Sequence, residues 1–434
     1  MKKGLVIYLL TALVLLASAQ EGDYFLSIKR YPFINYSKNE ITFLSDSTYF
    51  NPIYNKIDSI VLFGKGKLNI VHIGGSHIQA DIYTHQIRKQ LQSIQYDMNG
   101  GRGFIFPYTL AQTNNPWNYQ VSYTGNWDFC KNTKYKPACQ LGLAGYSVST
   151  SDTLASISIN LNNDSLTNFS YNHVKVFHTP GRYNLSIVNA DSAFSGVYDS
   201  IGGYTAFNVL PANTLELVVN KSDSTDAKFT LFGFNFENDN PGIVYHAIGV
   251  NGAKLESYLN CALYKQQIAQ LNPDLVIFSI GTNDGNTKHF NTPKYYREYR
   301  QLINTTRQAC PNTRIMITVP NDAYYYKRYV NKNTLQIRKE IFKIVQEENY
   351  AVWDFFSIMG GLNSSQEWYR YGIMKYDRVH FTRPGYLLKG DLFVTAFLRG
   401  WEKNITLRSK TYFEAKKLTQ NITTSQSITN DRRP

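Results

Sequence analysis

The sequence lacks the features that mark several large classes of protein. Only four of its 434 residues are cysteines, which excludes a small fold held together by dense disulfides. No Cys-x-x-Cys pair occurs and the eight histidines show no metal-ligand spacing, so we expect no metal site and no cofactor. Beyond the first 20 residues, no apolar run approaches the roughly 18 residues of a membrane span. With 43% hydrophobic and 15% aromatic residues, the composition also excludes a disordered chain.

The first 19 residues have the pattern of a secretory signal peptide. Two lysines precede the apolar stretch Leu5–Leu16, and Ala17-Ser18-Ala19 is typical of a cleavage site. We therefore predict an exported protein, periplasmic or secreted, with no transmembrane span once the leader is removed. An uncleaved membrane anchor is the weaker alternative, because the apolar stretch is short.

Acidic residues are scarce next to basic ones. The chain has 45 Lys and Arg against 32 Asp and Glu, a formal net charge of +13. The excess is uneven, because residues 111–241 hold seven basic and ten acidic residues. A positive field favours anionic partners such as acidic cell-wall polymers or membrane surfaces. Nucleic acid would suit the charge but not an exported protein, and an ordinary solvated basic surface remains an alternative.

Export would allow the cysteines to form disulfides. Cys130 and Cys139 flank a short lysine-rich stretch that a bridge would close into a loop. Cys261 and Cys310 each fall in a predicted helix, and a bridge between them is less favoured.

Alternating strand and helix patterns predict an α/β fold on both sides of residues 111–241. Short apolar runs are typical of buried parallel strands, and the amphipathic stretches between them are typical of helices. The predicted strands are 68–73, 243–248, 275–280, 314–319 and 351–356, and the predicted helices are 52–62, 81–94, 253–271, 293–309, 333–348 and 385–398. This rhythm indicates a parallel sheet with helices on both faces.

Residues 111–241 have a different pattern, with period-two alternation and hardly any helical period. The predicted strands are 154–161, 174–178, 183–188, 204–210, 214–219 and 229–236. Their spacing is typical of an all-β sandwich or jelly roll, which we interpret as a domain inserted into the α/β domain. The predicted division is a signal peptide at 1–19, a lead-in at 20–66, the α/β domain at 67–110 and 242–403 around the insert at 111–241, and a polar tail at 404–434.

A serine follows the first predicted strand of the α/β domain directly. In Gly74-Gly75-Ser76-His77 the glycines permit a sharp turn, which would present Ser76 at the carboxyl edge of the sheet, where α/β folds bind ligands. Taken alone, Ser76 is better explained as a helix cap. His72, on the strand itself, is better explained as a core residue.

Three further groups follow later strands. Asn283 in Gly281-Thr282-Asn283-Asp284 and the backbone N–H of Gly252 are donors that could hold an oxyanion at the same edge. Asp377 and His380 are three residues apart, so that the carboxylate can orient an imidazole that takes the proton of a serine. Each has a structural explanation, but together with Ser76 they predict a nucleophilic site.

At these residues the chain resembles the SGNH (GDSL-like) hydrolase family, over about 68–108 and 243–400. Ser76, Gly252, Asn283 and His380 match its four namesake positions, and Asp377 matches the third member of its triad. One departure is Gly75, where the family usually has Asp. The resemblance implies a flavodoxin-like three-layer hydrolase domain, with an oxyanion hole formed by Ser76, Gly252 and Asn283.

The segment Gly75–Asp81, Gly101-Arg-Gly-Phe104 and the β insert are similar to exported bacterial peptidoglycan or polysaccharide O-acetylesterases, whose jelly roll is related to carbohydrate-binding modules. The resemblance implies a serine esterase that removes O-acetyl or other short acyl groups from a cell-wall or other polysaccharide. Acyl transfer on the same scaffold and an inactive glycan-binding protein remain alternatives.

Other side chains near the serine have open roles. His77, Gln79 and Asp81 either line the pocket or are ordinary first-turn residues of the helix. The insert carries aromatic side chains that could stack on sugar rings, although most aromatic side chains in a sandwich pack in its core. These aromatic residues are Trp117, Tyr119, Tyr123 and Trp127. Neither the polymer nor the oligomeric state follows from the sequence.

Overall fold

The computed structural model describes residues 31–95, 97–134, 137–161, 169–189, 192–221 and 228–405. The described residues from Pro32 onward belong to one compact unit. The predicted signal peptide at 1–19 and nearly all of the predicted tail at 404–434 lie outside the described residues. Within the described part, no helix is both long enough and apolar enough to cross a membrane.

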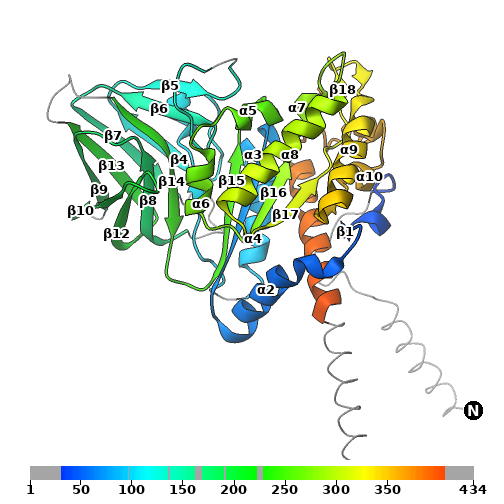
Figure 1. The fold of residues 1–434 in the computed structure, drawn as a ribbon, viewed down its shortest axis with the longest axis horizontal. Coiled ribbons are helices and arrows are strands. Elements are labelled where there is room, and N and C mark those ends of the chain that lie inside the picture. Colours follow the sequence, from blue (N-terminus) through cyan, green and yellow to red (C-terminus); the bar gives the residue numbers. More distant parts are fainter. Residues whose placement is uncertain are drawn as a thin grey trace, which may run out of the picture. The chain divides into compact units, whose positions relative to one another are not determined.

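A six-stranded sheet forms the centre of the α/β part (Figure 1). Its order is β1-β20-β17-β16-β2-β15, and every pairing is parallel except that of β1 with β20. The strands are β1 (Ile41–Phe43), β2 (Lys67–Gly74), β15 (Gly242–Gly249), β16 (Leu275–Ser279), β17 (Arg314–Thr318) and β20 (Ala351–Trp353). The predicted α/β fold is confirmed. The edge strand β1 was not predicted, because three residues carry too little periodicity.

Helices cover both faces of this sheet. On one face lie α5 (Leu255–Leu259), α6 (Tyr264–Gln270), α8 (Thr292–Ala309) and α9 (Asn333–Glu348). On the other lie α2 (Asn51–Phe63), α4 (Tyr83–Gln92) and the helical residues 383–405. Short helices are α3 (Ser76–Gln79), α7 (Thr282–Gly285), α10 (Phe355–Ile358) and α11 (Ser364–Arg370), with 3₁₀ turns at Tyr36–Lys38, Ser47–Phe50 and Tyr108–Ala111.

Two predicted elements were wrong in extent. The single helix expected over 253–271 is divided into α5 and α6, because the chain turns after Leu259. The strand expected over 351–356 ends at Trp353, because the Asp354 side chain accepts from the N–H of Ser357 and caps α10 there. A capping side chain thus ends the apolar run as a strand and starts a helix.

The inserted part is an antiparallel sandwich of two sheets, at the left of Figure 1. One sheet has the order β10-β9-β13-β7-β4, and the other β11-β12-β8-β14-β6-β5, with β3 paired to β14. The strands are β3 (Gly103–Ile105), β4 (Gln120–Thr124), β5 (Asp128–Lys131), β6 (Tyr146–Thr150), β7 (Leu154–Asn160), β8 (Tyr171–His178), β9 (Tyr183–Asn189), β10 (Ser192–Ser195), β11 (Val197–Asp199), β12 (Tyr204–Ala212), β13 (Thr214–Lys221) and β14 (Phe229–Glu237). A separate hairpin joins β18 (Tyr324–Tyr325) and β19 (Tyr329–Val330).

The sandwich contains the six strands expected and several shorter ones, and a disulfide joins Cys130 on β5 to Cys139. Cys261 and Cys310 are free. The strand β3 pairs with β14 although it precedes the expected start of the insert at residue 111. A single hydrophobic core contains residues of both parts, such as Ile73 of β2 and Phe234 of β14. The two parts are therefore packed together rather than joined by a loose linker.

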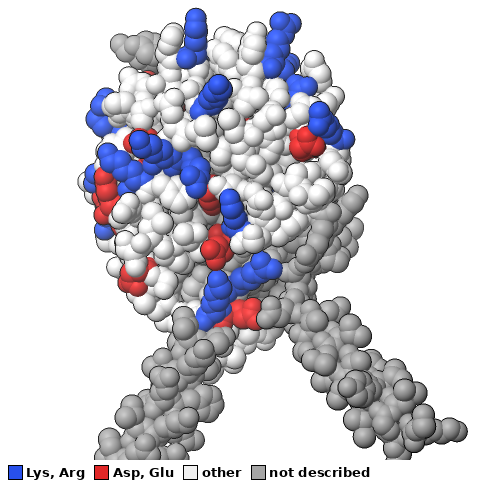
Figure 2. All heavy atoms as spheres, turned by 90° about the vertical axis from the view of Figure 1, so that its right-hand side faces the viewer, with Lys and Arg blue, Asp and Glu red and all other residues white. Residues whose placement is uncertain are grey.

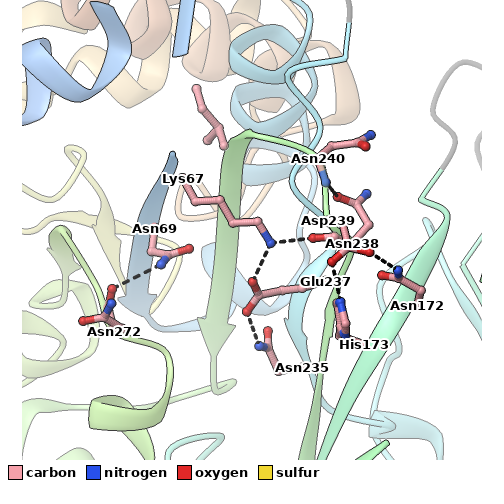
Figure 3. Close-up of polar contacts among 12 residues, drawn as sticks. Lys67, Asn69, Asn172, His173, Asn235, Glu237, Asn238, Asp239, Asn240 and Asn272 are labelled. Atoms are coloured by element: carbon pink, nitrogen blue, oxygen red, sulfur yellow. Dashed lines mark hydrogen bonds and ion pairs between the residues drawn. The ribbon is translucent and has the colours of Figure 1, made fainter. Parts of the chain in front are cut away.

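Polar contacts fasten the point where the chain returns from the sandwich to the central sheet (Figure 3). Lys67 at the start of β2 donates to Glu237 Oε2 at 2.9 Å and to the carbonyl of Asn238 at 2.6 Å. Burial raises the pKa of Glu237, but the charge and hydrogen bond of Lys67 outweigh it and the pKa lies below its ordinary value. Beside them His173 is 2.7 Å from Asp239. These contacts hold the end of β14, the last strand of the sandwich, against the start of β2 in the central sheet.

Charged residues are dispersed over the face that points away from the sandwich (Figure 2). Lys and Arg side chains are scattered over this face among mostly uncharged residues, and Asp or Glu side chains accompany several of them. Helices α8 and α9 carry such pairs, including Arg300–Glu348 at 2.6 Å. Exposed pairs of this kind contribute little to stability. On this face the positive charge does not gather into a single patch.

Candidate active site

Ser76 lies at the carboxyl end of β2, where α3 begins. The turn depends on Gly74, because a Cβ there would be 2.4 Å from Ile78 Cγ1 and 2.7 Å from the carbonyl oxygen of Ser279. Strand and helix can meet this closely only around glycine. The sharp turn presents the Ser76 hydroxyl at the sheet edge.

His380 and Asp377 meet Ser76 from the other end of the chain. The Ser76 Oγ atom is 2.9 Å from His380 Nε2, and His380 Nδ1 is 2.8 Å from Asp377 Oδ2. Asp377 Oδ1 accepts from the backbone N–H groups of Val379 and His380, both at 2.9 Å. Arg378 between them has a φ of +52°, which folds the segment so that carboxylate and imidazole face each other. These contacts form a continuous hydrogen-bonded chain from carboxylate to hydroxyl.

Asp377 is held as an anion by this geometry. Partial burial raises its pKa, but hydrogen bonds from the His380 side chain and from the N–H groups of His380 and Val379 outweigh it. The net pKa of Asp377 lies well below its usual range. An ionised carboxylate can fix the imidazole tautomer that leaves Nε2 free to accept the Ser76 proton.

The amide of Asn283 lies beside the turn that carries Ser76. Its Nδ2 atom donates to the carbonyl of Ala253 at 3.0 Å. It also lies so near Gly75 that a Cβ there would be 3.1 Å from Nδ2. The glycine that departs from the family pattern therefore admits the amide to the side of the serine. A Cβ at position 75 would require the Asn283 amide to shift by a few tenths of an ångström.

Gly252 belongs to the loop between β15 and α5. Its φ is +82°, a conformation that glycine adopts most readily, and no atom lies within 4 Å of where its Cβ would be. Asn283 and Asp284 both hold this loop, since Asp284 Oδ1 accepts from the N–H of Leu255 at 3.1 Å. Burial raises the pKa of Asp284 to about 7. The hydrogen bonds from Asn283 to Ala253 and from Leu255 to Asp284 fix this loop beside the turn that carries Ser76.

Gln79 supports the same loop from α3. Its Oε1 atom accepts from the N–H of Asn251 at 2.7 Å, and its Nε2 atom donates to the carbonyl of Asn114 at 3.2 Å. Asn251 Nδ2 in turn donates to Asn114 Oδ1 at 2.7 Å. Gln79 is 1% exposed. It therefore does not line an open pocket but positions the loop of Gly252.

Asp81 is also buried, in a cluster of charges behind the site. It is 2% exposed and pairs with Arg88 at 3.1 Å and Arg102 at 2.6 Å, while Asn118 Nδ2 donates to it at 2.8 Å. Burial raises the pKa of Asp81, but the two arginines outweigh it and the pKa lies well below its usual range. The cluster fastens α4 to residues 102–118. Sequence reasoning missed it because its members are up to 37 residues apart.

His77 packs behind His380, with ring centroids 5.3 Å apart, and its Nδ1 atom is 2.9 Å from the Tyr386 hydroxyl. Near it, Lys389 lies among aromatic rings, and burial lowers the pKa of Lys389 to about 7. His72 is fully buried, between Tyr245 and Ser279. His77, His72 and Lys389 are all buried. Lys389 carries no sequence signal, because lysines are usually exposed.

Among the residues that the structure describes, no cluster of His, Cys, Asp and Glu side chains could hold a metal ion. The assembled groups are a serine hydroxyl, an imidazole, an ionised carboxylate and amide donors. Such groups suit nucleophilic attack on a carbonyl, with the negative charge that develops on its oxygen held by N–H donors.

The chain is similar to a known protein family and to several solved structures. Residues 222–388 match the GDSL-like Lipase/Acylhydrolase family, a span that includes Gly252, Asn283, Asp377 and His380 but not Ser76. A solved structure titled a peptidoglycan O-acetylesterase is 20% identical and has a TM-score of 0.70, covering 84% of this chain and 99% of its own. An acetylxylan esterase from Geobacillus stearothermophilus is 20% identical, with a TM-score of 0.30, covering 37% of this chain and 73% of its own. No curated protein matches in sequence.

Proposed function

We propose that this chain, an SGNH-type serine hydrolase with a GDSL-like acylhydrolase domain, is an exported esterase. It would remove O-acetyl or other short acyl groups from a polysaccharide. The observation that carries this proposal is the hydrogen-bonded chain Asp377–His380–Ser76 with the Asn283 amide beside it.

The reaction would run through an acyl-serine. His380 Nε2 takes the proton of Ser76 as Oγ attacks the ester carbonyl, and the carbonyl oxygen becomes an oxyanion held by the N–H groups of Ser76 and Gly252 and by Asn283 Nδ2. The C–O bond to the sugar breaks, and the sugar oxygen takes the proton from His380. Water, deprotonated by the same imidazole, then attacks the acyl-serine, the bond from the acyl carbon to Ser76 Oγ breaks, and the imidazolium returns its proton to Oγ as the carboxylic acid leaves.

Two observations support a cell-wall glycan as the polymer. The predicted signal peptide would export the protein, and one structural neighbour, which covers 84% of this chain, is titled a peptidoglycan O-acetylesterase. O-acetylated peptidoglycan is therefore the first polymer to test.

A direct test measures acetate release from a chromogenic acetyl ester and from O-acetylated peptidoglycan by the wild type and Ser76→Ala. Ser45→Ala, a change at an exposed serine, is the matched control. We expect turnover by the wild type and the control and a loss of at least 10³-fold in Ser76→Ala. Equal turnover by Ser76→Ala would overturn the assignment. No turnover by any form would favour a protein that binds glycan without cleaving it.

A further inference from the structure

A second feature lies beside the site, where Arg383 follows His380 by three residues. Its side chain is exposed, and its guanidinium carbon lies 4.0 Å from the centre of the Trp117 ring. Among the residues that the structure describes, none accepts a hydrogen bond from the guanidinium of Arg383 and none forms an ion pair with it. A guanidinium carries five N–H donors along its edge, which a ring against one face leaves open. Arg383 therefore presents unused donors at the border of the site.

The other described arginines near the site have protein partners. The two arginines of the buried charge cluster both pair with Asp81. Arg378, two residues before the catalytic base, donates from Nε to Gln366 Oε1 at 2.7 Å and from one terminal nitrogen to the carbonyl of Lys327 at 3.0 Å. These three arginines are thus engaged in holding the fold. Arg383 differs from them because its donors remain for a ligand.

The Trp117 ring fixes the position of the Arg383 guanidinium. The Asn115 amide donates to the carbonyl of Tyr119 at 2.8 Å, which holds the turn that carries Trp117. The Trp117 ring also meets the ring of His85 edge to face, with centroids 5.3 Å apart. A cation–π contact engages the face of a guanidinium and not its N–H groups. Because the guanidinium is already held in place, it loses little freedom when its edge binds a ligand.

The segment that carries Trp117 connects the two sides of the site. Asn114, three residues before Trp117, accepts hydrogen bonds from Asn251 and Gln79 beside the oxyanion loop. At the other end of the segment, the Trp117 ring meets Arg383, which follows the loop of the catalytic base. The segment thus runs from the oxyanion loop to the loop of the base. A polymer whose ester occupies the site between these loops passes within reach of the Arg383 side chain.

The chemistry of this position favours an anion. Arg383 lies in the first turn of the helical residues 383–405, where the helix dipole disfavours a cation. The stability of the helix therefore does not explain a positive charge there. The parallel N–H groups at the edge of a guanidinium match the two oxygens of a carboxylate. A carboxylate beside the ester would supply the acceptor that Arg383 lacks among the described residues.

We propose that Arg383 binds a carboxylate of the polymer whose acyl group reaches Ser76. The proposal rests on the proposed esterase function and narrows its substrate to a polymer that carries carboxylates near the ester. A neutral acetylated polysaccharide would lack this contact, and so would a small ester such as p-nitrophenyl acetate. Arg383 therefore contributes to the affinity and specificity for polymer and leaves the chemistry at Ser76 unchanged.

The test removes the arginine and the carboxylate separately and together. Arg383→Gln and a matched control, Arg297→Gln at an exposed arginine of α8, are assayed on O-acetylated peptidoglycan before and after its carboxyl groups are converted to amides. We expect Arg383→Gln to raise the KM for native polymer about tenfold, because hydrogen bonds between charged groups are strong, and to leave the KM for amidated polymer unchanged. Amidation should raise the KM of the wild type to the same extent. Arg297→Gln should behave as the wild type, and all forms should keep the same kcat/KM for p-nitrophenyl acetate.

A purely structural role of Arg383 would give a different pattern. If Arg383 served only to tie the sandwich to the α/β part through Trp117, Arg383→Gln would impair turnover of native polymer, amidated polymer and p-nitrophenyl acetate alike, which would overturn the proposal. An equal rise in KM on native and amidated polymer would also overturn it, because the contact would then be to an anion that amidation spares, such as phosphate. An unchanged KM for native polymer in Arg383→Gln would overturn it as well.

A binding measurement separates failure of this contact from failure of the esterase function. Ser76→Ala is combined with Arg383→Gln or with Arg297→Gln, and co-sedimentation with native and with amidated insoluble peptidoglycan is measured. Weaker binding to native polymer only in the Arg383→Gln form, with equal binding of all forms to amidated polymer, would support the contact even if the wild type shows no turnover. Equal binding of both arginine variants to native polymer, or no binding by any form, would overturn it.

Discussion

Replacing Asn283 by alanine tests the proposed oxyanion hole most directly. Its Nδ2 group donates one hydrogen to the carbonyl of Ala253 at 3.0 Å and lies beside Gly75, next to Ser76. The second hydrogen of the amide is the one that an oxyanion on the substrate would accept. Asn283→Ala removes this donor and, with it, the contact to Ala253.

The lost oxyanion donor should affect kcat strongly, whereas the lost hydrogen bond to Ala253 should affect stability only slightly. Loss of one oxyanion donor costs about 10²–10³ in kcat, or roughly 2.7–4 kcal/mol in the transition state. Loss of the bond to Ala253 costs about 1 kcal/mol of folding free energy, which shifts Tm by only a few degrees in a chain of this length. We therefore expect kcat to fall at least 100-fold, with KM nearly unchanged because the contact strengthens only in the transition state.

Steady-state kinetics on an acetyl ester and a thermal melt make the comparison. Asn283→Asp is the matched control, because it keeps the shape but turns an acceptor and a negative charge toward the oxyanion. It should be no more active than Asn283→Ala. Gly75→Ala should lower kcat as well, because its Cβ displaces the amide by a few tenths of an ångström. A kcat within threefold of the wild type in Asn283→Ala would refute this role.

Three other changes probe the site and the fold. Asp377→Asn should lower kcat by about 10⁴-fold, because the imidazole of His380 loses the anion that fixes its tautomer and orientation; an unchanged kcat would remove Asp377 from the triad. Asp81→Asn should reduce the free energy of unfolding by about 3–5 kcal/mol, because it leaves two buried arginines without an anion. The pKa of Asp81 is depressed in the folded protein, so this contribution to stability is present above pH ~4 and is lost on acidification. The urea midpoints of the two forms should therefore converge at low pH. Residues 111–241 expressed alone should melt less cooperatively than residues 103–241, which add the strand β3; identical melts by circular dichroism would contradict a structural role for β3.

The sequence predicted the elements that carry long periodic patterns. The strands β2, β15, β16 and β17 lie where the apolar runs indicated, and α8 and α9 lie where the amphipathic pattern did. Shorter elements were missed. The strands β4 and β10 are mostly exposed and short, so period two hardly shows in them, and β1 is held in place by its partner β20 rather than by its own residues.

The candidate residues of the site could be named from their positions after strands, but their supports could not. The role of Gln79 depends on a hydrogen bond to Asn251, which is 172 residues away. Trp117 faces Arg383 only because the sandwich packs against the α/β part. Contacts of this range follow from tertiary packing, which no local pattern encodes. The proximity of Gly75 to Asn283 likewise appears only in three dimensions.

The place of β2 in the central sheet has a consequence for how the chain is made. β2 lies between β15 and β16, and both are synthesised only after the whole sandwich. At about 5–20 residues per second, an apolar strand thus waits on the order of ten seconds on the ribosome without either neighbour. Its buried residues, such as Val71 and Ile73, are open to wrong partners during that time. Slowed translation within the sandwich should therefore lower the yield of folded protein, and a holdase chaperone that covers nascent β2 should restore it.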